Sequence, residues 1–211
     1  MKALKVDSMI FDLDGTLWDC TGIFARAWEE ELNKQPDVDV RISADQLKQL
    51  FGKILEEIGA QLFPGKTPER INELLQICYA AEDLALEREE PSLYPETEKI
   101  LQQLSARIPL FVVSNCQSGY IEKFYAKTGF GKYFTGKLCP GDSGEAKAEN
   151  IRRIVADYGL QHPVYIGDTL GDYTATKDAG IPFVFAAYGY GQVPAPDAVI
   201  SCPADLLALL S

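Results

Sequence analysis

The amino-acid sequence predicts an α/β fold, in which a Rossmann-like parallel sheet core carries an inserted block of helices. Four short apolar runs, rich in β-branched and aromatic residues, lack the alternation of a strand with one solvated face. Such runs are typical of strands buried on both faces, and they lie at residues 9–11, 110–113, 164–166 and 183–185. Helical patterns separate the later runs from one another. The long stretch that follows the first run, up to the second, contains helical patterns and no strand pattern.

The helical patterns of the predicted core each gather apolar residues on one side. Residues 96–106 align Ile100, Leu101 and Leu104, and similar patterns occupy residues 118–128 and 147–158. Alternation of strands and helices at this spacing favours parallel strands joined by right-handed crossovers.

The inserted segment contains no convincing strand. Four helices are expected, and they lie at residues 21–35, after Ser43, at residues 54–62 and from Thr67-Pro68. Ser43 and Thr67 are suited to cap a helix N-terminus, and proline is favoured at the first helical position.

Roughly seventy residues are too many for an ordinary crossover. We therefore expect a helical cap domain over residues 18–91 and an α/β core over residues 1–17 and 92–211. The alternative is that the inserted helices simply cover the sheet.

The composition restricts the possible partners. The chain has 211 residues, 46% hydrophobic and 24% charged, and its net charge is −11. Such a surface repels nucleic-acid phosphates and anionic lipids. No apolar run reaches the ~18–20 residues that span a bilayer, and charged residues interrupt the start before a signal-peptide core can form. We expect a cytoplasmic protein with neither nucleic acid nor membrane as a partner.

Cysteine and histidine contribute little to the expected chemistry. The five cysteines are an odd number without a CxxC pair, which indicates reduced thiols rather than disulfides or zinc. The single histidine, His162, lies in a Gln-His-Pro turn and is expected at the surface. The chemistry must therefore come from carboxylates, lysine and small polar groups.

Polar residues follow three of the predicted strands. These segments are Asp12-Leu13-Asp14-Gly15-Thr16, Ser114-Asn115 and Gly167-Asp168-Thr169-Leu170-Gly171-Asp172. Because the carboxyl ends of neighbouring parallel strands open into one crevice, we expect Asp12, Ser114 and Asp168 to meet in one site.

Each of these elements has an ordinary structural explanation when it is taken alone. Asp-Gly-Thr is usually a turn, Asp168 or Asp172 can cap the next helix, and Lys147 can lie on a solvated helix face. However, Asp-x-Asp-Gly-Thr alone should occur by chance in only about one chain of this length in several hundred. The whole set in this order favours a functional site.

The set resembles the four motifs of the haloacid dehalogenase-like (HAD) hydrolase superfamily, over the whole chain. The matching segments are Asp12-Leu13-Asp14-Gly15-Thr16, Ser114-Asn115, Lys147 and Gly167-Asp168-x-x-x-Asp172. The insert is similar to the small α-helical cap of the phosphoglycolate phosphatase and β-phosphoglucomutase branch. The resemblance implies the HAD fold with a cap domain. One departure is Ala148, where this branch often has proline.

The resemblance implies a role for each residue. Asp12 is the nucleophile that becomes an aspartyl phosphate. Asp12 and Asp168 hold a metal ion through their side chains, Asp14 holds it through its backbone carbonyl, and Asp172 supports this shell. Oxygen ligands without histidine or cysteine favour Mg²⁺.

The remaining roles concern the substrate. Ser114, Asn115 and Lys147 are expected to bind the phosphoryl oxygens. Asp14 is expected to protonate the leaving oxygen and then to activate water, which argues against C–Cl cleavage and ion pumping. Thr16 is expected to add a hydrogen bond within its turn.

We therefore expect a Mg²⁺-dependent phosphatase that acts on a small phosphate ester such as phosphoglycolate or a sugar phosphate. A phosphomutase of the β-phosphoglucomutase type and a non-catalytic phosphate-binding module are the alternatives. β-Phosphoglucomutase has a cap histidine twelve residues after its nucleophile, and this chain has Phe24 there, which favours hydrolysis.

Substrate specificity and assembly stay open at this point. Candidate specificity residues, each also explicable as structural, are Trp18, Thr21, Arg26 and Gly52-Lys53. The sequence leaves the oligomeric state open, and a monomer is compatible with it.

Overall fold

The computed structural model describes residues 5–53 and 55–210 and divides into two compact units. The first contains the chain up to Trp18 and again from Leu93 onward, and the second spans Asp19–Ser92. The predicted ranges of the domains include residues 1–4, 54 and 211, which lie outside the described residues. The assignment of residues 18–91 as a cap domain stays a prediction.

The first unit is built on a six-stranded sheet whose described strand pairs are all parallel. In spatial order its strands are β5 (Gly136–Leu138), β4 (Leu110–Val113), β1 (Ser8–Phe11), β6 (Pro163–Gly167), β7 (Phe183–Ala186) and β8 (Ala198–Ile200). The predicted α/β fold class is confirmed. The four predicted strands are confirmed as well, to within one residue at each end.

Burial explains which strands the sequence revealed. Every residue of β1, β4 and β6 is buried, so these strands read as continuous apolar runs. The edge strands β5 and β8 were not predicted, because they have three residues each and are only partly buried.

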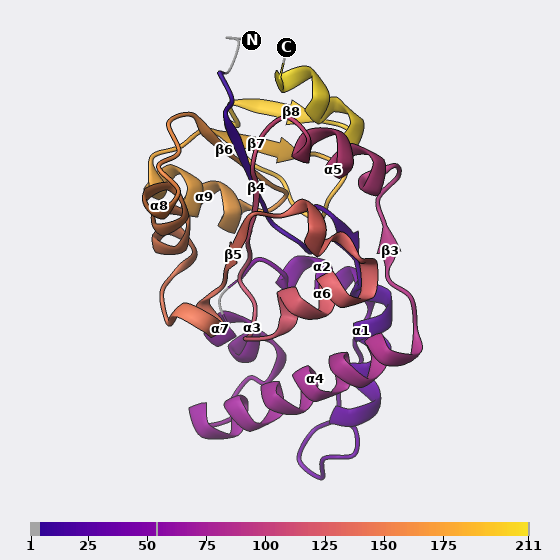
Figure 1. Ribbon diagram of the computed structural model, residues 1–211. Coiled ribbons are helices and arrows are strands. Elements are labelled where there is room, and N and C mark those ends of the chain that lie inside the picture. Colours follow the sequence, from indigo (N-terminus) through magenta and orange to yellow (C-terminus); the bar gives the residue numbers. More distant parts are fainter. Residues whose placement is uncertain (1–4, 54, 211) are drawn as a thin grey trace. The chain divides into compact units, whose positions relative to one another are not determined.

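Helices cover both faces of this sheet. They are α5 (Thr97–Ser105), α6 (Tyr120–Thr128), α7 (Pro140–Ser143), α8 (Lys147–Asp157) and α9 (Leu170–Ala179), with 3₁₀ segments η1 (Phe130–Tyr133) and η2 (Pro203–Leu210). The three predicted core helices are confirmed to within two residues. Figure 1 shows α8 and α9 together on one side of the sheet and α5 on the other. One core cluster joins sheet and helix residues such as Ile10, Phe111, Tyr165, Ile151 and Ile154.

The second unit is helical, as predicted for this segment. Its helices are α1 (Thr21–Leu32), α2 (Ala44–Leu50), α3 (Leu55–Leu62) and α4 (Pro68–Arg88). Ser43 forms a capping box with Gln46, and the Thr67 side chain accepts a hydrogen bond from the Arg70 N–H, so both predicted N-caps are confirmed. Helix α1 ends three residues earlier than expected, because a helix seldom continues up to a proline and Pro36 follows.

The chain passes between the units through two short strands that were not predicted. These are β2 (Trp18–Asp19) and β3 (Ser92–Leu93), which pair with one another. Two-residue strands are too short to leave a periodic signal in a sequence.

Three further expectations concern single residues and the membrane. His162 is exposed, as predicted. The five cysteines, all in the described part of the chain, form no disulfide. Among residues 5–53 and 55–210, no helix combines the length and apolarity that crossing a bilayer requires.

Candidate active site

The three central strands β4, β1 and β6 end at one edge of the sheet, where their polar residues gather. β1 lies between β4 and β6, and the strand order runs in opposite directions on its two sides. Ligands of open α/β sheets bind at such a switch point. Asp12 follows β1, Ser114 follows β4, and the Ser114 side chain is hydrogen-bonded to the Asp12 carboxylate. The predicted meeting of distant segments is therefore present.

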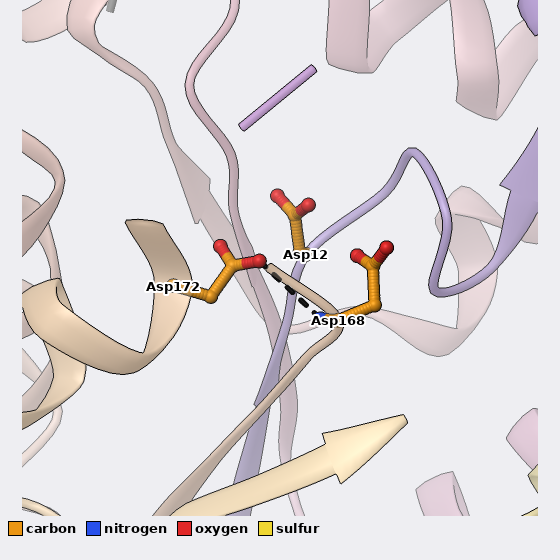
Figure 2. A group of neighbouring side chains, drawn as sticks. All are labelled: Asp12, Asp168 and Asp172. Carbon is orange, nitrogen blue, oxygen red and sulfur yellow. Dashed lines mark hydrogen bonds between the residues drawn. The ribbon is translucent and has the colours of Figure 1, made fainter. Parts of the chain in front are cut away.

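Three carboxylates form the centre of the site. Asp12, Asp168 and Asp172 each place a carboxylate oxygen within 4.8 Å of the other two, and all three residues are buried. Figure 2 shows their origins: Asp12 at the end of β1, Asp168 in the turn after β6, and Asp172 in the first turn of α9.

Lys147 supplies a positive charge to this cluster. Its ammonium nitrogen lies 3.0 Å from Asp12 Oδ1 and 2.5 Å from Asp172 Oδ1. The same nitrogen lies 5.5 Å from the centre of the Tyr165 ring. Lys147 is the first residue of α8 and is 4% exposed. The alternative of a lysine on a solvated helix face is therefore wrong.

The charge balance of the cluster suits a divalent cation. Burial and the neighbouring Asp172 raise the pKa of Asp12 to about 6, against the lowering effect of Lys147. Burial and the other two carboxylates also raise the pKa of Asp168 well above its usual value. Burial opposes the charge on Lys147, but Asp12 and Asp172 outweigh it and raise the pKa of that ammonium.

In the part of the chain that the structure describes, Lys147 is the single buried Lys or Arg. Three ionised carboxylates against one ammonium would leave an excess of negative charge in a poorly solvated place. Buried charges are costly unless they are paired or coordinate a metal. A hard cation with oxygen ligands therefore fits these residues.

Asp172 is engaged differently from the other two carboxylates. Its Oδ2 accepts hydrogen bonds from the Thr169 N–H at 3.0 Å, the Thr169 hydroxyl at 2.7 Å and the Asp168 N–H at 3.3 Å. The last of these is the dashed line in Figure 2. Thr169 is the N-cap of α9 and forms a capping box with Asp172. Asp172 thus helps to cap α9, which is the ordinary structural role considered for it above, and it also pairs with Lys147. Asp168 is not the cap of this helix.

The loop that holds Asp168 was not predicted from the sequence. This loop follows β7, and its Tyr190 N–H donates a 2.7 Å hydrogen bond to Asp168 Oδ2. A Cβ on Gly189 would lie 2.3 Å from Asp168 Cβ, which is closer than real contacts allow. The alternating glycines of Tyr188-Gly189-Tyr190-Gly191 were the available signal, because glycine in a strand-end loop often marks a close backbone approach.

Thr16 contacts the same carboxylate. Its hydroxyl donates a 3.2 Å hydrogen bond to Asp168 Oδ1. The Thr16 N–H also donates a 3.1 Å hydrogen bond to the Leu13 carbonyl, so the expected hydrogen bond within the turn is present, and the hydroxyl adds one to the turn after β6. Gly15 between Asp14 and Thr16 has φ of +82°, and a Cβ there would lie 2.2 Å from Asp168 Oδ2. Glycine is thus required by both conformation and space.

Asp14 is not one of the three clustered carboxylates and is partly exposed. Its Oδ1 accepts a 2.9 Å hydrogen bond from the Tyr120 hydroxyl. Tyr120, the first residue of α6, was not singled out from the sequence. Asn115 directly follows Ser114 beyond β4, and its side chain is half-buried.

The candidate specificity residues differ in burial and in their contacts. Trp18 is fully buried, and Thr21 is 1% exposed and donates a hydrogen bond to Asp19. Arg26 is exposed and forms an ion pair with Glu89. Lys53, beside Gly52 in the turn between α2 and α3, donates a hydrogen bond to Gln61.

Comparisons with known proteins agree with this geometry. Residues 9–186 match the sequence model of the family described as haloacid dehalogenase-like hydrolase. A phosphoglycolate phosphatase from Neisseria meningitidis is 28% identical over 201 residues, which cover 89% of this chain and 83% of that protein. Another from Aquifex aeolicus is 26% identical and covers 96% of this chain and 95% of its own.

The fold has close counterparts among solved structures. A haloacid dehalogenase-like hydrolase from Streptococcus pneumoniae superposes with a TM-score of 0.84 at 22% identity, over 98% of this chain and 99% of that one. This likeness supports the fold.

Proposed function

Because the chain belongs to the haloacid dehalogenase-like hydrolase family, we propose that it is a Mg²⁺-dependent phosphatase acting on a small phosphomonoester. The family and the enzyme class, a hydrolase, are those that the sequence predicted, and the comparisons confirm both. The reaction proposed here runs through an aspartyl phosphate on Asp12.

The observation that best supports this proposal is the environment of Asp12. Its carboxylate is buried between the Lys147 ammonium and the Ser114 hydroxyl, and Asp168 and Asp172 lie beside it. Lys147 and Ser114 fix the orientation of the carboxylate, so that one of its oxygens can attack phosphorus in line with the leaving group. Burial excludes bulk water from the bond that forms.

The proposed metal ligands are the side chains of Asp12 and Asp168 and the backbone carbonyl of Asp14. A bound Mg²⁺ would supply positive charge that offsets repulsion between the nucleophile and the phosphoryl oxygens. Asp168 is suited to a ligand's role because Thr16 and Tyr190 hold its two oxygens. Asp172, with three donors on one oxygen, orients Lys147 instead.

Asp14 is proposed as the acid and base. In the first half-reaction Asp12 forms its bond to phosphorus while the bond to the leaving oxygen breaks, and Asp14 gives its proton to that oxygen. In the second half-reaction Asp14 takes a proton from water, water forms the bond to phosphorus, and the Asp12–phosphorus bond breaks. Ser114, Asn115 and Lys147 hold the phosphoryl oxygens through both steps.

The substrate proposed first is phosphoglycolate, because the curated relatives described above are phosphoglycolate phosphatases. The test is phosphate release from a panel of 2-phosphoglycolate, sugar phosphates, nucleoside monophosphates and p-nitrophenyl phosphate, with Mg²⁺ and with EDTA. We expect Mg²⁺-dependent release from p-nitrophenyl phosphate and a preference for phosphoglycolate. Equal rates in EDTA would contradict the metal requirement, and no release from any ester would contradict the function.

The same panel tests the phosphomutase alternative. Phe24 is fully buried in α1 and lies near Phe51, with ring centres 6.3 Å apart, so it is a core residue of the helical unit. A phenyl ring offers no hydrogen bond that could hold off water. With β-glucose 1-phosphate we expect free phosphate to exceed glucose 6-phosphate. The reverse order would favour the mutase.

A further inference from the structure

We propose that Tyr120 is a positioning residue for Asp14 and that it sets the geometry of proton transfer to the leaving group. This inference rests on the proposed function, in which Asp14 is the acid and base. It concerns a side chain that none of the sequence motifs includes.

The contact joins segments that are far apart in the sequence. The Tyr120 hydroxyl donates to Asp14 Oδ1 at 2.9 Å, across 106 positions of the chain. Tyr120 is 3% exposed, whereas Asp14 is partly exposed. A buried, rigid donor therefore holds a carboxylate that lies at the edge of the solvent.

Aromatic packing fixes the direction of the Tyr120 ring. The Trp18 ring meets it edge-on, with centres 5.8 Å apart and planes at 69°. Trp18 in turn packs against Phe124 of the same helix at 4.9 Å. Both Trp18 and Phe124 are fully buried, so the tyrosine has little freedom to swing away from Asp14.

The backbone links the same residues. The Gly15 N–H donates to the Trp18 carbonyl at 2.9 Å, and Asp14 and Trp18 form an isolated β-bridge. The turn that presents Asp14 and the ring that braces Tyr120 therefore belong to one short segment. Gly119, with φ of +85°, is the N-cap of α6 and sets where this helix begins.

The chemistry needs such a support. An acid works when its proton lies on the line to the leaving oxygen, and misplacement of about 1 Å can cost ~10²-fold in rate. A donor at Oδ1 limits rotation of the carboxyl group and directs the proton to Oδ2. The same hydrogen bond holds the carboxylate in place when it takes the proton from water.

The chain offers a matched control on the same helix. Tyr125 of α6 also has a buried hydroxyl, and this hydroxyl has no hydrogen-bond partner among the described residues. Its ring stacks on Phe134 at 5.6 Å. Tyr125→Phe therefore removes the same atom from the same helix without removing a contact to Asp14.

The experiment compares Tyr120→Phe with Tyr125→Phe and the wild-type protein, all with Mg²⁺. Two substrates are used: p-nitrophenyl phosphate, whose leaving group departs without a proton, and an alkyl phosphate from the panel that the wild-type protein hydrolyses. For the alkyl phosphate we expect kcat/KM of Tyr120→Phe to fall about 10- to 100-fold, part of the ~10²–10⁴ that an acid contributes. For p-nitrophenyl phosphate we expect less than about a threefold fall. Tyr125→Phe should match the wild type on both.

The ratio kcat/KM reports only the steps up to and including the first irreversible one. It therefore measures transfer of the phosphoryl group to Asp12 without the later hydrolysis. Equal losses on the two substrates would mean a general structural role and would overturn the positioning role, as would no loss on either. If the wild-type protein hydrolyses neither ester, the proposed function itself fails and the inference falls with it. Melting temperatures of the two variants within a few degrees of each other show that folding does not explain the difference.

Discussion

Asp12 shows how burial changes what a single carboxyl group can do. On a surface it would be ionised and hydrated, whereas here burial and Asp172 raise its pKa to about 6. The 3.0 Å contact with Lys147 keeps it oriented at the same time. The residue is held in place as an anion that is poorly stabilised by water, which is the state a nucleophile needs.

Replacing this carboxylate tests its role directly. Asp12→Asn keeps the shape but removes the attacking anion, so we expect turnover to fall by at least ~10³-fold, equivalent to about 4 kcal/mol of transition-state stabilisation. Phosphate release with Mg²⁺ measures this loss. Asp157→Asn, an exposed carboxylate on α8, is the matched control and should remain active. Near-normal turnover in Asp12→Asn would remove it from the role of nucleophile.

At the scale of an element, the loop after β7 packs so closely against its neighbours that one position has no space for a side chain. Gly189 lies so close to Asp168 that an added Cβ would be 2.5 Å from Oδ2 and 2.5 Å from the Gly15 carbonyl oxygen. The loop and the turn after β1 therefore enclose this carboxylate between two backbones. Both segments therefore lie against the carboxylate that is proposed as a metal ligand.

Gly189→Ala should displace Asp168 and weaken metal binding. We expect the Mg²⁺ concentration for half-maximal activity to rise about tenfold. A displaced ligand that weakens metal binding by ~1.4 kcal/mol lowers the affinity by this factor. A titration of activity with Mg²⁺ measures this. Gly22→Ala is the control, because the nearest atom to its added Cβ is Arg26 Nη1 at 3.9 Å, and the same midpoint as wild type is expected. Unchanged metal dependence in Gly189→Ala would show that the loop adapts.

The longest helix depends on the capping residue at its start. The Thr67 side chain accepts a hydrogen bond from the Arg70 N–H at 3.3 Å at the start of α4. Thr67→Ala leaves that donor without its cap, so we expect a loss of about 1 kcal/mol in the free energy of unfolding. Denaturant unfolding measures it. Thr67→Ser, which keeps the hydroxyl, should recover most of the loss, and equal losses in both variants would argue against the cap.

At the scale of the whole molecule, the carboxylate cluster couples stability to pH and to metal. Asp12 binds its proton more tightly when folded, with a pKa of about 6 against an ordinary 3.8. The pKa of Asp168 is raised as well. Between the ordinary pKa of Asp12 and its raised value, the folded protein binds more protons than the unfolded chain. The stability that this proton contributes is therefore lost as the pH rises from about 4 through 6.

Divalent cations should reverse this loss, because they compete with protons for the same oxygens. We expect the rise in melting temperature caused by Mg²⁺ to be larger at pH 7.5 than at pH 5. Asp12→Asn, which removes one of the three charges, should reduce both the metal-free loss of stability with pH and the effect of Mg²⁺. A Mg²⁺ effect that is equal at the two pH values would contradict the coupling.

The choice of ion is a separate test on the complete protein. EDTA should abolish phosphate release and Mg²⁺ should restore it. Ca²⁺ has longer and looser coordination, so it should stabilise the protein against heat yet support little turnover, because Asp12 is then misplaced relative to phosphorus. Full turnover with Ca²⁺ would contradict the geometric requirement.

The sequence by itself determined the central strands, most helices, the helix caps at Ser43 and Thr67, and the family. These features leave local signals, since a strand buried on both faces is a continuous apolar run and a cap is one residue type at one position. The motif residues Asp12, Ser114 and Asp168 could be brought together from the rule that parallel strands end at one edge.

Only the tertiary structure decided how these residues are held. Thr16 reaches Asp168 across 152 positions, Tyr120 reaches Asp14 across 106, and the Gly189 loop lies against a carboxylate from another strand. Such contacts have no fixed spacing along the chain, because the sheet order, not the sequence, makes β1, β6 and β7 successive neighbours. The role of residues such as Thr16, Tyr120 and Gly189 is visible only in the folded protein, where each lies beside a carboxylate.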